Sequence, residues 1–247
     1  KIIKDFLDFK ALQYEQPSFI ETDPISLVHR FTKKEDIEIV GLLMATIAWG
    51  QRKSIIKSGE KLLQILGAHP HEFVLNYQNN TCPDFTHRTF NRTDLNGFLM
   101  GLKACYQNGD LEKAFMTSST EANLYAHIGA FRNKFIPALE PRTYKHVADP
   151  TSGSAAKRLV MFLRWMVRSN AKGVDFGIWT TISAAQLYVP LDVHTGNIAR
   201  KLGLIQRTQN DWKTNEELIE QLRVFDPIDP AKYDFALFSL GVTEKYI

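Results

Sequence analysis

The chain has 247 residues, enough for one large domain or two small ones with a sizeable core. Hydrophobic residues make up 44% and charged residues 23%, an ordinary globular balance. Because the formal net charge is only +3, any nucleic-acid-binding surface would have to be a local patch. Cys82 and Cys105 are the only cysteines, too few for a four-cysteine zinc site or an iron–sulfur cluster.

Hydropathy and cysteine content also bear on location. No apolar run approaches the roughly 20 residues that a membrane-spanning helix needs. The first residues, KIIKDFLDFK, carry charges where a signal peptide would be apolar. Two cysteines are compatible with a reducing compartment. These features predict a cytoplasmic protein that contacts no membrane.

Helix signals are plentiful in the first half of the chain, and strand signals are scarce. Thr32–Glu35, TKKE, matches a capping box, and apolar residues follow it on most sides of a helix. This pattern predicts a central buried helix that ends near Gly50, and a second helix is expected to end at Gly67. The remaining expectations here are a short helix within 69–80, a polar loop over 79–92, and helices capped by Thr93 and Thr120.

The second half predicts more helices joined by short connections. The stretch 155–169 has one apolar face, with Arg164 and Arg168 on another. Thr214–Glu217, TNEE, matches a second capping box, and DPAKYDFALFSLG predicts a helix that Asp229 caps. The fold class predicted from these signals is all-α.

The most informative stretch is Tyr188–Gly203, YVPLDVHTGNIARKLG. Pro190 ends the element before it, because proline fixes φ and lacks an N–H group. Asp192 then stands where a helix begins, so its carboxylate can accept from the first free backbone N–H groups. Gly203 is the expected end of the helix. A capped amphipathic helix explains this pattern, but it does not explain why His194 and Thr195 crowd the same helix start.

The string PLDVHTGNIARKLG resembles the aspartate motif of the helix-hairpin-helix DNA glycosylases. This superfamily includes endonuclease III, MutY and 8-oxoguanine glycosylase, and its P-x-D-x-H string places a catalytic aspartate at a helix N-terminus. EIVGLLMATIAWGQRKSIIKSGEKLL is similar to the first barrel helix of that fold and the helix after it, and KYDFALFSLG to a late one. The chain is identified as a member of an uncharacterised bacterial family of the DUF2400 type, whose members share GSACKRLNMFLRWMVR and PLDVHTGRVARKLGL.

The resemblance implies two helical subdomains with a cleft between them. Residues 36–170 would form a helical barrel with the hairpin and Lys157, and residues 1–35 plus 171–247 a second part with Asp192. The implied partner is double-stranded DNA with a flipped damaged base. The implied activity is base-excision repair, with an oxidised purine removed and possible strand scission as an AP lyase. No cofactor, metal or iron–sulfur cluster is expected, a departure from the endonuclease III and MutY branches.

Lys157 is the candidate nucleophile. In the superfamily the catalytic lysine ends a G-x-G-x-K hairpin, and GSAAK matches it with Gly153 at the first glycine. Ala155 stands at the second glycine, a departure that puts the hairpin geometry and any bound monovalent cation in doubt. Lys157 and Asp192 are 35 residues apart (192 − 157), nearer to the archaeal 8-oxoguanine glycosylases than to the usual spacing. The simpler interpretation is a solvated lysine in the first turn of a helix.

The motif also supplies candidate DNA-binding residues, and each has a plainer interpretation. His194 matches a histidine that contacts a phosphate, or it merely stands at a helix start. Gln51 matches the glutamine of the family's L-S-Q string and could meet the flipped base or the opposite strand, or it is an exposed amide at a helix end. The other candidates are Gly153, Ala155, Arg158, Arg164 and Thr195, some of which could be ordinary surface residues.

Three other functions remain open at this stage, because a fold alone does not decide function. The first is a non-catalytic nucleic-acid-binding module of the same fold, which would bind DNA without releasing a base. The second is an enzyme that acts on RNA or a free nucleoside, with activity that does not depend on a duplex. The third is a helical interaction protein with no salt-dependent affinity for DNA.

Overall fold

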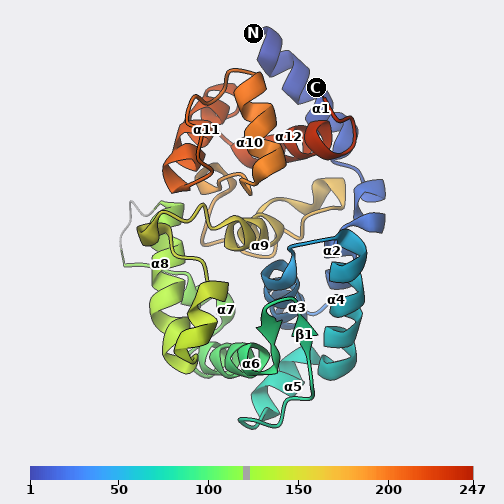
Figure 1. Ribbon diagram of the computed structural model, residues 1–247, viewed down its shortest axis with the longest axis vertical. Coiled ribbons are helices and arrows are strands. Elements are labelled where there is room, and N and C mark those ends of the chain that lie inside the picture. The colour runs from blue at the N-terminus through green and yellow to red at the C-terminus, as the bar shows by residue number, and fades with distance from the viewer. Residues whose placement is uncertain (119–122, 247) are drawn as a thin grey trace. The chain divides into compact units, whose positions relative to one another are not determined.

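The computed structural model describes residues 1–118 and 123–246, and this part of the chain is mostly helical (Figure 1). The all-α expectation is therefore confirmed, apart from one short two-stranded sheet among the described residues. The chain forms two compact units. Unit 1 contains residues 1–19 and 149–247, and unit 2 contains residues 20–148.

Unit 1 is built from the first helix of the chain and the last four. Its α-helices are α1 (Ile2–Tyr14), α9 (Lys157–Val167), α10 (Val193–Lys201), α11 (Trp212–Phe225) and α12 (Tyr233–Val242). The 3₁₀ turns that lie wholly within it are Pro150–Ser152, Asn170–Lys172, Ala184–Gln186 and Pro230–Lys232. Helix α12 packs against both α1 and α10, so it is the centre of this unit.

Unit 2 is built around α3, which is buried from Asp36 to Ile47 and packs against three neighbouring helices. The expected central buried helix is confirmed. The α-helices of the unit are α2 (Ile25–Val28), α3 (Lys34–Ile47), α4 (Arg52–Leu66), α5 (Pro70–Asn76), α6 (Arg92–Gln107), α7 (Leu111–Ala114) and α8 (Leu124–Phe135). Two further 3₁₀ turns are Ile136–Ala138 and Pro141–His146, and Pro17–Thr22 joins the two units.

The expected polar loop over 79–92 contains the sheet. Strands β1 (Thr86–His87) and β2 (Phe90–Asn91) pair antiparallel, with His87 opposite Phe90. Both of these residues are buried, which a polar composition does not predict.

Several helices begin at residues other than those expected. Helix α3 begins at Lys34, and its N-cap residue Lys33 makes no side-chain hydrogen bond to the helix, so the predicted TKKE capping box is wrong. Asp211 caps α11 and leaves Thr214 inside the helix, and Asn91 rather than Thr93 caps α6. At α6 and α11 a stronger side-chain acceptor stands two or three residues earlier, whereas at α3 no side chain caps the helix. The expected cap Thr120 lies outside the described residues, and Asn123 caps α8.

The two units also differ from the expected subdomains 36–170 and 1–35 plus 171–247. The second boundary falls at residue 148 rather than 170, so α9 belongs to the same unit as Asp192. Arg164 on α9 and Arg168 directly after it bind carboxylates of unit 1. Lys157 and Asp192 are therefore held within one unit.

Two glycines offer a test of packing in unit 2. A Cβ on Gly59 of α4 would overlap the buried side chains of Leu27 and Met44, whereas a Cβ on Gly129 of α8 would meet nothing. Alanine gains about 1 kcal/mol over glycine in a helix, and overpacking a core costs roughly 1–3 kcal/mol. In urea titrations we expect Gly129→Ala to raise the free energy of unfolding. The free energy of unfolding of Gly59→Ala should be lower than that of Gly129→Ala by about 1–3 kcal/mol. Equal effects would contradict this packing.

Candidate active site

Lys157 and Asp192 meet in unit 1. Lys157 is the first residue of α9, and Asp192 is the N-cap of α10. The Lys157 Nζ atom donates to Asp192 Oδ2 over 2.9 Å. The lysine side chain is 34% exposed and the aspartate 17%, so the pair is only partly buried. The structure therefore brings together the two residues that the sequence singled out for chemistry.

Backbone contacts fix the aspartate. Its Oδ1 atom accepts the Thr195 N–H over 2.9 Å, as expected for an N-cap. The Asn210 amide donates to the Asp192 carbonyl over 3.1 Å and holds the start of α10 from the loop before α11. The expected helix is confirmed at both ends, because Gly203 follows α10 with a φ of 69°. One carboxylate oxygen thus serves the fold, while the other faces the lysine.

The surroundings keep Asp192 ionised. Burial alone would raise the pKa of this carboxyl. The charge of Lys157, the Thr195 N–H and the nearby His194 outweigh burial and leave the pKa below its usual value. A carboxylate at this position can stabilise a positive charge that develops next to it.

The segment before Lys157 is a strained turn. Gly153 has a φ of 87° and Ala156 a φ of 49°, a left-handed conformation that a non-glycine residue adopts only at a cost. Helix α9 consequently starts at Lys157 and not at 155 as expected. The turn is tied to α11, because the Gly153 carbonyl accepts from the Trp212 N–H over 3.0 Å.

This turn differs from a simple helix-hairpin-helix in two respects. The element directly before Gly153 is the 3₁₀ turn Pro150–Ser152. The N–H groups of Gly153, Ser154 and Ala156 donate within the segment, to Pro150, Asp149 and Ser154 oxygens. The expected role of the hairpin, to present N–H groups to a phosphate, is therefore reduced. Ala155, expected beside the phosphate, is 7% exposed.

The expected DNA-binding residues are divided among different environments. His194 is exposed on the first turn of α10, whereas the Thr195 side chain is fully buried. Arg158 is mostly buried, which lowers the pKa of its guanidinium to about 10. Gln51 is exposed at the N-cap of α4 in unit 2.

Arg164 has a different role from the one expected. It is 4% exposed, and its guanidinium binds Asp175 over 3.2 Å and also Asp234. A guanidinium bound to two buried carboxylates does not reach a DNA phosphate, so the prediction of a DNA contact is corrected to a structural one. Arg168, one turn later, binds Asp175 over 2.6 Å and Asp229 over 2.7 Å.

Asp234 was not among the residues predicted from the sequence, and its carboxyl interacts electrostatically with both Asp192 and Lys157. Burial raises the pKa of its carboxyl to about 6, against the charge of Arg164 and with the help of the negative charge of Asp192. The signal that could have revealed it is the pair of arginines on the mostly apolar α9, since buried arginines require carboxylate partners.

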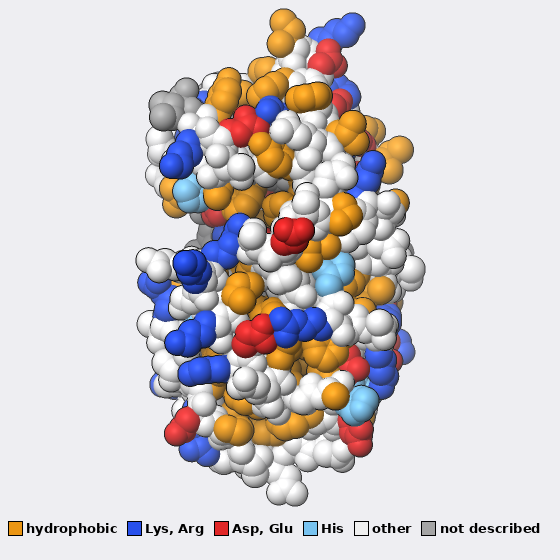
Figure 2. All heavy atoms as spheres, turned by 90° about the vertical axis from the view of Figure 1, so that its right-hand side faces the viewer, with side chains coloured by type: hydrophobic (Ala, Val, Ile, Leu, Met, Phe, Trp, Pro, Cys, Tyr) orange, Lys and Arg blue, Asp and Glu red, His pale blue; other side chains and the backbone are white. Residues whose placement is uncertain are grey.

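Basic side chains elsewhere form local groups. Figure 2 shows Lys and Arg gathered over part of unit 2, among acidic and apolar side chains. On α4 the exposed Lys53, Lys57 and Lys61 recur every four residues and share one face.

None of the helices in residues 1–118 and 123–246 is long and apolar enough to cross a membrane.

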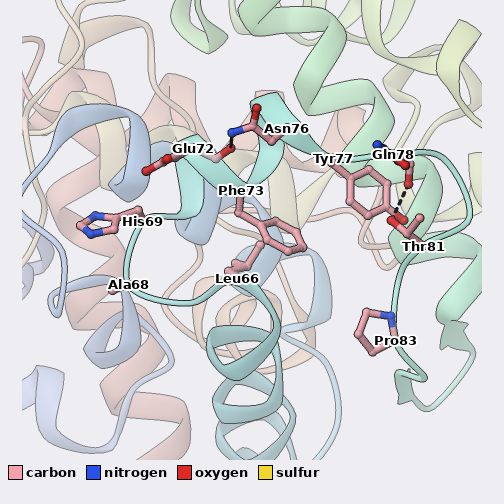
Figure 3. Close-up of a pocket in the computed structure, with 10 residues that line it drawn as sticks. All are labelled: Leu66, Ala68, His69, Glu72, Phe73, Asn76, Tyr77, Gln78, Thr81 and Pro83. Carbon is pink, nitrogen blue, oxygen red and sulfur yellow. Dashed lines mark hydrogen bonds between the residues drawn. The ribbon is translucent and has the colours of Figure 1, made fainter.

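Unit 2 also has an open cavity of about 620 Å³ at the end of α4 and along α5. Figure 3 shows Phe73 and Leu66 within it, and Glu72, Asn76 and Gln78 around it. This cavity contains none of the candidate catalytic or DNA-binding residues, so it does not extend the site.

Comparison with known proteins gives one result. The family model described as "Protein of unknown function (DUF2400)" matches residues 23–243, a span that includes Lys157 and Asp192. No curated protein and no solved structure matches the chain.

Asp192 variants should separate capping from charge. Asp192→Asn keeps a side-chain oxygen for the Thr195 N–H and loses only the partly exposed ion pair, worth about 0–1 kcal/mol. Asp192→Ala also loses the cap, so we expect it to be less stable than Asp192→Asn by roughly 0.5–2 kcal/mol in urea titrations. Equal losses would mean that the cap does not stabilise α10.

Asp234 should make stability depend on pH. Its folded pKa of about 6 lies above the ordinary 3.8, so the folded state binds the proton more tightly. That stabilisation is complete below pH 3.8 and is lost as pH rises through 6. We expect the free energy of unfolding of the wild type, relative to Asp234→Asn, to fall by roughly 1–3 kcal/mol across this range. Asp84 is exposed, so Asp84→Asn should show the same dependence of unfolding free energy on pH as the wild type. If the pH dependence of Asp234→Asn also runs parallel to that of the wild type, the raised pKa of Asp234 is contradicted.

Proposed function

We propose that this chain, which belongs to the DUF2400 family, is a DNA glycosylase with the helix-hairpin-helix fold. The observation that carries the proposal is the 2.9 Å contact between Lys157 Nζ and Asp192 Oδ2 at the start of α10. An amine and a carboxylate at this distance are the two groups that a bifunctional glycosylase needs. The left-handed turn before Lys157 and the capped aspartate helix also agree with the order of elements in that superfamily.

In the proposed reaction the base leaves as Lys157 attacks. The ammonium must first lose a proton, and Asp192 Oδ2 is an acceptor within reach. The amine nitrogen then bonds to C1′ of the flipped nucleotide while the N-glycosidic bond breaks, and Asp192 returns its proton to the departing base and becomes a carboxylate again. Asp192 stabilises the positive charge that develops on the sugar. The proposed substrate is an oxidised purine in double-stranded DNA.

A lyase step can follow on the same lysine. Opening of the sugar ring leaves a Schiff base between Lys157 and C1′. Loss of a C2′ proton then expels the 3′ phosphate by β-elimination and cuts the strand. Exposed His194 at the start of α10 and exposed Gln51 on unit 2 are the proposed DNA contacts. We place the protein in the cytoplasm, where its two buried cysteines would stay reduced.

A non-catalytic DNA-binding module is the second candidate. The contact that supports chemistry also neutralises both side chains, as a structural ion pair would. The internal hydrogen bonds of the turn before Lys157 favour the same interpretation, because they serve the fold rather than a ligand. This module would bind duplex DNA but release no base.

Borohydride trapping tests the proposal. A duplex oligonucleotide carrying 8-oxoguanine or an abasic site is incubated with each variant and borohydride, which reduces a Schiff base to a stable adduct. We expect an adduct with the wild type and with the exposed control Lys213→Ala, but none with Lys157→Ala. Asp192→Asn should slow base release by about 100-fold or more, because the charge next to the sugar is lost.

The other outcomes of this experiment are also informative. An adduct that survives in Lys157→Ala would assign the nucleophile to a different lysine. Base release without an adduct would retain the glycosylase and remove the lyase step. Duplex binding with neither product would overturn the enzyme proposal in favour of the binding module.

A further inference from the structure

A pocket of unit 1 lies along α10, beyond Asp192. It is a pocket of about 360 Å³, lined by His194, Asn197 and Lys201 of α10, by Gly241 of α12, and by Lys245 after that helix. The three α10 residues are spaced i, i+3 and i+7, so they share one face of the helix.

Gly241 allows the pocket to form where α12 meets α10. A Cβ on Gly241 would lie 3.1 Å from His194 Cβ and 3.3 Å from the His194 carbonyl oxygen. Those distances are tighter than ordinary packing contacts. The absence of a side chain at Gly241 lets α12 approach the first turn of α10, so the two helices form one side of the pocket.

The charge of the pocket is positive. Arg200, Lys201 and Lys245 line it, and none of the described lining residues is acidic. The neighbouring Glu244 carboxylate accepts from Lys10 over 2.6 Å and from the Tyr14 hydroxyl on α1. The C-terminal ends of α10 and α12 contribute about −0.5 each, which three full positive charges exceed.

The lysines still have donors to offer a ligand. Arg200 uses its guanidinium to bind the 207–210 loop, so it contributes charge but few donors. Lys201 donates to the Tyr246 carbonyl over a long 3.3 Å, and an ammonium has three N–H groups. Lys201 and Lys245 are both exposed, so a ligand can reach them.

We propose that this pocket binds a phosphate group. The source of that phosphate would be the DNA backbone, and this assignment rests on the proposed function. Lys201 is nine positions after Asp192 along α10, about 14 Å at 1.5 Å per residue. Phosphates of one strand rise by about 3.4 Å each along a duplex. The bound phosphate would therefore lie roughly two to four nucleotides from the reacting sugar, and the pocket would orient the strand along α10.

The test compares Lys201→Gln/Lys245→Gln with the wild type and with the exposed Lys213→Gln on α11, all in the full chain. The first arm measures the affinity for a duplex carrying an abasic site at several salt concentrations. Removing one phosphate contact lowers the slope of log K against log salt by about 1. We expect that change in the double variant and an unchanged slope in Lys213→Gln, with unchanged circular dichroism in both.

The second arm titrates pyrophosphate by calorimetry, without DNA. We expect binding to the wild type and to Lys213→Gln, and at least tenfold weaker binding to the double variant. If pyrophosphate binding is weakened in the double variant but no protein binds the duplex, the phosphate pocket is retained and its ligand is a small phosphorylated molecule. The proposed function is then overturned. An unchanged salt slope together with unchanged pyrophosphate affinity in the double variant would overturn the pocket while leaving the glycosylase proposal intact.

Discussion

The position of the candidate active site depends on buried ion pairs along α9. Arg164 follows Lys157 by seven residues on α9, and Arg168 is the C-cap residue of that helix, eleven residues after Lys157. Their carboxylate partners come from both ends of unit 1: Glu15 after α1, and Asp175, Asp229 and Asp234 in the C-terminal part. These bonds hold α9 in one register, and the register places Lys157 opposite Asp192.

Two arginines and four carboxylates would leave an excess of buried negative charge if all were ionised. Burial raises the pKa of Glu15, and it raises the pKa of Asp234 to about 6. Both shifts move the cluster toward charge balance, because a protonated carboxyl can still share hydrogen bonds with a guanidinium. Loss of one partner from such a cluster typically costs 3–5 kcal/mol, far more than a surface pair. The Lys157–Asp192 pair is more exposed than this cluster, so it contributes less to stability than its buried neighbours do.

Local chemistry explains which sequence predictions succeeded. Asp192 caps α10 because the interaction spans only three residues, and α3 is buried because its apolar residues surround the helix. The capping boxes TKKE and TNEE failed because a motif of four letters does not identify the acceptor that the backbone uses; Asp211 took that place for α11. Arg164 was misassigned because one of its partners, Asp234, is 70 residues away. Neither helix caps nor apolar periodicity reports on chemistry, so the catalytic role of Lys157 and Asp192 stays a prediction.

The division of the chain has a consequence for its synthesis. Unit 2 is one continuous segment inserted between the first helix of unit 1 and the remainder. A ribosome completes all of unit 2 before it makes α9, whereas α1 packs against α12, which follows α9, α10 and α11 in the chain. Domains generally fold as units during translation. The side of α1 that packs against α12 therefore has no partner until unit 2 and the helices α9, α10 and α11 have been made.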